Sequence, residues 1–549
     1  MLLAALPPLA LVAVRASMPD ASRLAFLARL LYWTMPIVLA LAVAAWLWRW
    51  RAGATSLRTA ATGLWPGAVA AVLLTVAVSW LVPAEMRVQF DETSLVGCSQ
   101  NMHGQRAALM TTGAVPFEGE IVPIENVVDK RPPLFAFLTS LLHDVSGYRI
   151  ANAFAVNAGL LALGLLLVFA AARARLPLRA ALAAPFALLA VPLTSVVATS
   201  AGFDLLAAVL FLVVLLAALD FVRQPDTVRF VALLAGGVLF AQSRYESLPA
   251  LLLAGGVVLY AVRGRWRPDR GALLALAACP VLLTPLVLLL LHARDPMFYP
   301  EARGQALVSV QHFAAHLPPM LAAWFWPCID NALPGIVAFV ALPAWSWWLW
   351  RGRSSIADAV VLVPVFGVTA LVLCWFFGDV HQRPALRLFL PLAWLTALAP
   401  LLWAALVPRL GTCVLAAMVV LCGVRLHAVQ RGAAFARLPI AELTDGIDAM
   451  LLQHPGDART TLWVSTAAQH LIVEGRAALS PRSFLARQRE VLDYERGGHV
   501  RTIYVLTTPL DAAMAPAFGD PAEVLARRRS VVEFRIDGPA PITVHRLVR

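Results

Sequence analysis

Two clusters of charged residues mark the two ends of one long hydrophilic segment. Asp91 and Glu92 follow soon after a long apolar run, and Asp129, Lys130 and Arg131 directly precede two prolines and the next apolar stretch. A carboxylate at a membrane surface, partly removed from water, suits a general base for a hydroxyl or amine, and an acid pair also suits a divalent cation. Adjacent cations suit the complementary task, because they stabilise negative charge that develops on a leaving phosphate.

Both clusters also have simpler interpretations. Asp91 and Glu92 can be solvated loop acids, and the basic cluster can be an anchor for lipid headgroups. Lys130 is the only lysine among the 44 lysine and arginine residues. Its compact charge and adjustable pKa are properties that arginine does not share. They favour a phosphate or carboxylate contact over the alternative that this one lysine is present by chance.

The elements that must position these residues are membrane helices. Of the 549 residues, 60% are hydrophobic and only 14% are charged, against about 25% charged in a soluble domain. The mean hydropathy is +0.76. Apolar runs long enough to span a bilayer predict an all-α polytopic membrane protein with about twelve transmembrane helices. They lie near 31–48, 64–82, 150–172, 180–199, 203–222, 228–243, 247–262, 271–291, 331–350, 356–377, 386–407 and 410–428.

Arginine-rich turns set the direction of these helices. Alternate connections are short and basic, which is typical of the cytoplasmic side of a membrane protein. The opposite side then receives the loop 83–149, which carries the candidate site, and the loop 292–330. The net charge of +12 therefore indicates membrane orientation and anionic lipid contacts, and we expect no nucleic acid partner. This orientation also places Arg15, Arg23 and Arg29 outside.

Within loop 83–149, residues 92–110 and 134–142 are predicted as short amphipathic helices on the membrane surface, whereas 117–119 and 124–126 are predicted to be irregular. After residue 430 the apolar runs shorten and charges become frequent. Strands near 461–466, 501–508, 530–537 and 541–548 and helices near 441–453, 467–475 and 483–497 predict a small α/β extracytoplasmic domain. It contains no phosphate-loop or metal motif. The predicted division is 1–63 with one extra helix, 64–430 and 431–549.

Further polar residues fall on the same side as the long loop. Arg244 is a candidate phosphate ligand in a tight turn, and Glu246 beside it suggests a structural ion pair. His381 and Arg383 lie in a polar turn that leads to Arg387 at the top of a late helix. A histidine in such a turn is more often a surface residue than a ligand. His312 and His316 have helical spacing, but we find no third zinc ligand near them in the sequence.

The Asp-Glu pair after a membrane exit, the Lys-x-Pro-Pro-Leu segment that ends the same loop, and the late Arg-x-x-x-Pro helix resemble the GT-C glycosyltransferases. The resemblance covers roughly residues 64–428 and is strongest to the group containing the protein O-mannosyltransferases and the lipid A aminoarabinose transferase. It implies a polyprenyl-phosphate sugar donor and a reaction on the outer face of the membrane. Asp91 corresponds to the catalytic acid, Lys130 to the donor-phosphate lysine and Arg387 to a donor-site arginine. The tyrosine that follows that arginine in the family is absent here.

The resulting hypothesis is an inverting glycosyltransferase in the cell (inner or plasma) membrane. Asp91 would deprotonate an extracytoplasmic acceptor, and Glu92 would assist it or, with it, bind a divalent metal. Lys130, Arg244 and Arg387 would hold the departing phosphate. Two alternatives remain open. One is a transporter or flippase of a lipid-linked or anionic substrate. Transporters usually carry polar residues in the middle of the membrane, whereas the ionisable residues here lie mostly at helix ends, with Asp204 as the main exception. The other is a non-catalytic envelope assembly protein.

Overall fold

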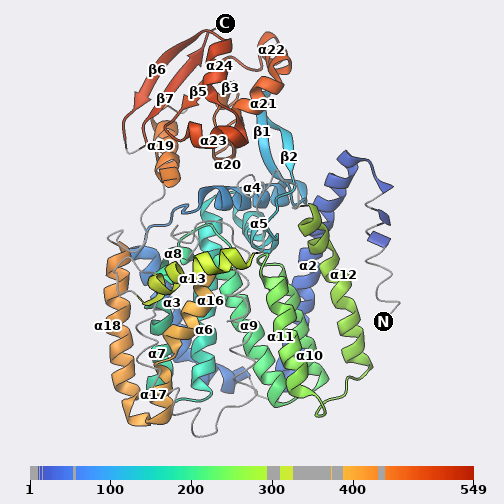
Figure 1. Ribbon diagram of the computed structural model, residues 1–549, viewed down its shortest axis with the longest axis vertical. Helices are drawn as coiled ribbons and strands as arrows, with labels where there is room; N and C mark the ends of the chain where they lie inside the picture. The colour runs from blue at the N-terminus through green and yellow to red at the C-terminus, as the bar shows by residue number, and fades with distance from the viewer. Residues whose placement is uncertain are drawn as a thin grey trace.

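The computed structural model describes residues 17–53, 57–292, 309–325, 387–430 and 439–548, apart from residues 455 and 539, together with a few isolated positions. A bundle of membrane helices forms one end of the molecule and a sheet domain caps the other, with two helices lying across the boundary (Figure 1). The bundle contains α2 (Asp20–Ala52), α3 (Leu57–Leu81), α6 (Ala151–Arg173), α7 (Leu178–Leu189), α8 (Pro192–Ala198), α9 (Asp204–Arg223), α10 (Thr227–Ala241), α11 (Ser247–Val262), α12 (Arg270–His292), α13 (Val310–Phe325), α16 (Leu390–Leu398), α17 (Leu401–Leu406) and α18 (Gly411–Gln430).

Seven of the described helices, or eight if the bent pair α7–α8 is one span, are long and apolar enough to cross a membrane. The predicted helices at 331–350 and 356–377 lie outside the described residues, so the predicted number of spans stays a prediction. Each of the other ten predicted spans coincides with a described helix or broken helix pair. The fit follows from the bilayer, which demands long apolar runs with internally satisfied backbone groups.

Two spans predicted as continuous are broken next to a proline. The predicted helix 180–199 is the pair α7–α8, bent by 71°, and Pro192 opens its second half. The predicted helix 386–407 is the pair α16–α17, and Pro400 precedes its second half. Proline lacks the N–H that continues a helix and its ring clashes with the preceding turn. Proline is compatible with both breaks but does not dictate them, because α12 continues through Pro280 and Pro285.

The described arginine-rich turns lie together at one end of the bundle. Arg49, at the end of α2, contacts Asp220 of α9 with a nitrogen–oxygen distance of 2.7 Å, and Arg229 of α10 lies 3.3 Å from the same carboxylate. Arg265, after α11, donates to the Val222 carbonyl at 3.2 Å. The turn at 351–354 lies outside the described residues. The alternating direction that the sequence predicts thus holds for the described helices, while the compartment at each end remains a prediction.

At the opposite end, loop 83–149 folds as α4 (Gln89–Gln105), β1 (Met110–Phe117), β2 (Glu120–Val127) and α5 (Leu134–Ser146). The two predicted helices are present, and both lie across the boundary between the bundle and the C-terminal domain (Figure 1). Residues 92–99 are buried, because α4 packs between α5 on one side and α20 (Ala468–Val473) of the C-terminal domain on the other. The prediction that 117–119 and 124–126 are irregular is wrong. They belong to an antiparallel hairpin whose turn holds Glu118 and Gly119 at φ of 50° and 81°.

The start of α2 also lies at this end. The Ala108 N–H donates to the Ala28 carbonyl at 2.9 Å, and Arg106 donates to the Tyr32 hydroxyl at 3.1 Å. These bonds place Arg23 and Arg29 of α2 on the same side as the long loop, as the predicted alternation requires. The two arginines oppose the positive-inside pattern there, whereas the basic turns at the other end follow it.

The C-terminal domain contains α19 (Pro439–Gln453), β3 (Thr461–Val464), α20 (Ala468–Val473), β4 (Ala478–Leu479), α21 (Pro481–Ala486), α22 (Gln488–Arg496), β5 (Thr502–Thr507), α23 (Asp511–Phe518), α24 (Pro521–Arg527), β6 (Ser530–Ile536) and β7 (Ile542–Leu547). The sheet order is β4-β3-β5-β7-β6, with β3 parallel to β4 and β5 and the other pairs antiparallel. All four predicted strands are confirmed. Alternate residues fill two cores, such as Trp463 on one face and Leu462 on the other.

This domain is fixed to the long loop by specific contacts. Arg487 pairs with Glu125 of β2 at 2.8 Å, and the Tyr148 hydroxyl donates to the Val473 carbonyl at 2.8 Å. Phe518 stacks on Phe90 of α4 with ring centroids 5.6 Å apart. The hairpin therefore packs on the C-terminal domain, and α4 lies between that domain and the helical bundle (Figure 1).

The topology leads to a first prediction. Arg265, in the α11–α12 turn, should lie in the cytoplasm and residue 430 outside, because an odd number of predicted spans separates them. A reporter that works only in the cytoplasm should therefore be active after Arg265, and one that works only outside should be active after residue 430. Paired phosphatase and fluorescent-protein fusions measure both sites. The reverse activities would place the long loop in the cytoplasm.

Candidate active site

Three arginines from distant parts of the chain meet at two aspartates where the bundle joins the long loop. Arg131 follows β2, Arg244 lies between α10 and α11, and Arg387 precedes α16. Asp91 lies in the first turn of α4, and Asp204 is the first residue of α9. Each aspartate contacts two of the arginines, and Arg387 contacts both aspartates. The five side chains therefore form one connected ion-pair network.

Asp91 is held by two guanidinium groups, one at each carboxylate oxygen. Arg131 donates to Oδ1, with its Nε at 3.2 Å, and Arg387 donates to Oδ2. The Asp91 side chain is 22% exposed and that of Arg131 is 8% exposed. Burial opposes ionisation of Asp91, but the attraction of the two arginines outweighs it and holds the Asp91 pKa well below its usual range. Asp91 is thus an ionised carboxylate whose charge is already balanced.

Asp129 shares Arg131 with Asp91 but has the opposite pKa shift. The distance from Arg131 Nη1 to Asp129 Oδ1 is 2.6 Å. The other oxygen, Oδ2, is buried and has no hydrogen-bond partner among the described residues. Burial raises the pKa of Asp129 despite the attraction of Arg131. Two neighbouring carboxyl groups with pKa values pushed apart are a pattern of acid–base sites.

Arg244 joins Asp204 to Glu246. Its Nη1 contacts Asp204, its Nε lies 3.1 Å from Glu246, and its guanidinium carbon lies 4.7 Å from the centre of the Phe203 ring. The expected ion pair between Arg244 and Glu246 is present. The role of Asp204 was missed at the sequence level, where it was only an ionisable residue inside an apolar run. Such a residue in a membrane segment is itself a signal for a functional partner.

Glu92 faces away from the arginines. Its carboxylate accepts backbone N–H groups of Arg87, Val88 and Ala201, each at 3.1 Å. Burial raises the Glu92 pKa, although the three N–H groups oppose the shift. The side chain therefore ties the start of α4 to the segment between α8 and α9.

Lys130 is half-buried, it lies in the chain between Asp129 and the network member Arg131, and its charge acts on Asp129. His381 and Arg383 lie outside the described residues. His312 and His316 stack with ring centroids 5.8 Å apart, and His316 Nδ1 lies 3.1 Å from the Leu373 carbonyl oxygen.

The bundle, the helical loop after α3 and the C-terminal domain together have the GT-C fold, and the chain is a multi-pass membrane protein. The chain resembles the crystal structure of ArnT from Cupriavidus metallidurans in the apo state, with a TM-score of 0.52 and 16% identity over 88% of this chain and 98% of that one. Neither a protein-family model nor a curated protein matches the sequence.

Two further structures were matched. ArnT from the same organism bound to undecaprenyl phosphate has a TM-score of 0.44 and 17% identity, over 87% of this chain and 97% of that one. The oligosaccharyltransferase AglB from Archaeoglobus fulgidus, in complex with an inhibitory peptide and a dolichol-phosphate, has a TM-score of 0.47 and 12% identity, over 86% and 73%. At these identities the likeness concerns the fold.

The network leads to a stability prediction. Asp204→Asn should destabilise the protein by about 3 kcal/mol, because breaking a buried ion pair leaves its partner charge uncompensated. Titration with a denaturing detergent measures the loss. The matched control is Asp493→Asn, whose pair with Arg496 is 73% and 78% exposed and should contribute about 0–1 kcal/mol. Equal effects of the two substitutions would contradict the structural role of Asp204.

Proposed function

We propose that this protein is a membrane glycosyltransferase that moves a sugar from a polyprenyl-phosphate donor to an acceptor outside the cytoplasm. The observation that carries the proposal is the convergence of Arg131, Arg244 and Arg387 on Asp91 and Asp204. The GT-C fold shared with apo ArnT supports it. The donor phosphate, the reacting sugar and the base would meet at this network.

A phosphate is the ligand that best suits the network. Guanidinium groups bind carboxylate and phosphate with the same planar fork, so a phosphate can replace an aspartate as the partner of Arg131 or Arg387. The helix that follows Arg387 is apolar, and its Pro391 and Trp394 line a small apolar cavity with Phe211 of α9, so hydrocarbon is the chemistry that suits this part of the bundle. A polyprenyl phosphate combines these two requirements, a charged head and a hydrocarbon chain.

Donor binding would also activate the base. While both arginines hold Asp91, it is ionised but a weak proton acceptor. When a phosphate draws Arg131 and Arg387 away, the buried Asp91 loses its counter-charges and its proton affinity rises. Asp91 can then take the proton of the acceptor hydroxyl or amine as that atom bonds to the anomeric carbon. The bond between that carbon and the phosphate oxygen breaks, and its electron pair leaves with the polyprenyl phosphate, which inverts the anomeric centre.

The remaining residues take supporting roles in this proposal. Lys130 adds a compact charge for the phosphate beside Asp129. Glu92, which the sequence suggested as an assisting acid or metal ligand, is instead a positioning residue that holds the first turn of α4 through three backbone N–H groups. The cations that face Asp91 are guanidinium groups, so the proposal requires no divalent metal at Asp91 and Glu92.

The first test separates these two carboxylates. Asp91→Asn should still fold, although less stably, because Arg131 and Arg387 lose their carboxylate partner. It should bind undecaprenyl phosphate at least as tightly as the wild type, because the two arginines are then available to the phosphate. Its transfer rate should fall by about 10²–10⁴-fold, the usual contribution of a positioned base. Glu92→Gln should instead lower thermal stability, with activity falling in proportion to folded protein. Transfer is measured in native membranes supplied with labelled polyprenyl-phosphate sugars.

The outcomes distinguish the alternatives. Full transfer by Asp91→Asn would remove Asp91 from the mechanism. Lipid movement across the bilayer by the wild type, with no sugar transfer from any polyprenyl-phosphate donor, would favour a flippase.

The second test concerns Lys130. If it binds one phosphate in a confined site, the larger planar fork of arginine will not replace its compact charge. A lost charge-assisted hydrogen bond is worth about 1.5–3 kcal/mol, or about one to two decades in rate. Lys130→Arg should therefore be impaired and Lys130→Ala more so, with both proteins stably inserted.

Arg263→Lys, in the turn at the far end of the bundle, is the matched control and should keep full activity. A wild-type rate for Lys130→Arg would make the unique lysine an accident of composition and would leave phosphate binding to the three arginines.

A further inference from the structure

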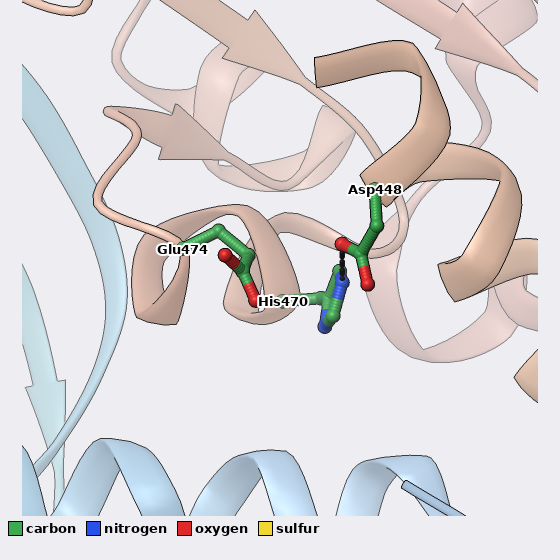
Figure 2. A group of neighbouring side chains, drawn as sticks. All are labelled: Asp448, His470 and Glu474. Carbon is green, nitrogen blue, oxygen red and sulfur yellow. Dashed lines mark hydrogen bonds and ion pairs between the residues drawn. The ribbon is translucent and has the colours of Figure 1, made fainter. Parts of the chain in front are cut away.

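Three potential metal ligands meet at the base of the C-terminal domain, above α4 (Figure 2). Asp448 comes from α19, His470 from α20, and Glu474 directly follows α20; one ligand atom from each lies within 4.8 Å of the others. We propose that these residues bind a divalent transition-metal ion of the Zn²⁺ type. The sequence shows no metal motif here because Asp448 lies on a separate helix, far from the His470–Glu474 spacing.

The donor set decides which class of ion would bind. An imidazole nitrogen with two carboxylate oxygens is a common set for zinc and related ions. Calcium and magnesium prefer oxygen ligands throughout. Three protein ligands leave a further position for water, and the exposed faces of Asp448 and Glu474 give an ion access from solvent.

The hydrogen bonds of the cluster also favour a cation. His470 is 3% exposed, and its Nε2 lies 2.7 Å from Asp448 Oδ1. Its Nδ1 is buried without a hydrogen-bond partner among the described residues. An ion bound by both His470 and Asp448 would take the lone pair of Nε2 and replace the present contact between Nε2 and Asp448 Oδ1, and Nδ1 would then carry the ring proton. In the part of the chain that the structure describes, no hydrogen bond or ion pair engages the Glu474 carboxylate, although it lies beside a second acid.

The position of the cluster suggests what the ion does. It would link α19, the first described element after the membrane bundle, to α20, which packs on α4. Val473 of α20 also accepts the hydrogen bond from Tyr148 at 2.8 Å. Because α4 carries Asp91, metal binding would hold the C-terminal domain in place over the candidate active site. We therefore assign the ion a structural role, coupled to stability because it binds only the folded arrangement.

The test uses the full chain in detergent, stripped with a chelator and titrated with Co²⁺, whose visible absorption reports bound imidazole and carboxylate. The wild type should bind one equivalent at this site, which Zn²⁺ displaces, and Zn²⁺ should raise the unfolding temperature. His470→Gln, Asp448→Asn and Glu474→Gln should each weaken Co²⁺ binding at least about tenfold, since even second-shell changes typically cost 10–100-fold. Their unfolding temperature in chelator should match the wild type, which shows that they fold.

Two controls locate the ion. His499→Gln changes a histidine of the same domain outside the cluster and should leave the titration unchanged. The double variant His312→Gln/His316→Gln should also retain the site. Loss of Co²⁺ binding in the double variant alone, wild-type binding by His470→Gln, or no saturable binding by the wild type would each overturn the proposal.

Discussion

The cost of placing charge away from water constrains the whole upper part of the bundle. Desolvating one carboxylate or guanidinium costs several kcal/mol even after relaxation, so each buried charge requires a nearby partner. Asp204, with a side chain 4% exposed, is the first residue of a helix that is then apolar as far as Asp220, and it requires Arg244. Asp91 requires Arg131 and Arg387. Because these partners belong to five segments, pairing them fixes α4, α9, the α10–α11 turn, the end of the long loop and the start of α16 in one layer.

The same constraint explains why loop 83–149 is long and why it is not a surface loop. α4 must bring Asp91 over the bundle while its opposite face is covered. Glu92 secures its first turn to the segment after α8, and the C-terminal domain covers its other side through α20. The hairpin reaches up to Arg487 through Glu125. The domain is therefore attached to the layer that carries the charges, which makes its position relevant to any reaction there.

The sequence predicted most of what the bilayer dictates. An apolar run such as 150–172 must become a spanning helix, and α6 (Ala151–Arg173) follows it within a residue. Asp91, Arg244 and Arg387 could be expected at one end because successive helices alternate in direction. Local patterns did not predict features that depend on tertiary partners. Val115 of the hairpin is fully buried only because the C-terminal sheet packs on it, and interruptions by glycine and proline disguise its strands.

The sequence pattern also did not predict which distant residues pair with one another. No spacing links Asp204 to Arg244, and none links Asp448 to His470, because the two members of each pair belong to different elements of the chain. Glu92 shows the converse error. Adjacent acids look equivalent in a sequence, but neighbouring side chains on a helix diverge by about 100°. One of the two faces the arginines and the other faces the backbone.

Together with the adjoining charges of Asp129, Lys130 and Glu246, the network is formally neutral. Lys130, Arg131, Arg244 and Arg387 carry four positive charges, and Asp91, Asp129, Asp204 and Glu246 carry four negative charges. Under the proposed reaction this balance matters at the moment of transfer. The donor is a phosphodiester with one negative charge, and the departing polyprenyl phosphate is a monoester that approaches two. If Asp91 takes the acceptor proton, it loses one negative charge as the phosphate gains one. The total charge of the buried layer then stays constant through the step. A layer that is expensive to charge would thus favour the reaction in which proton transfer to Asp91 accompanies departure of the phosphate, and would disfavour loss of the phosphate alone.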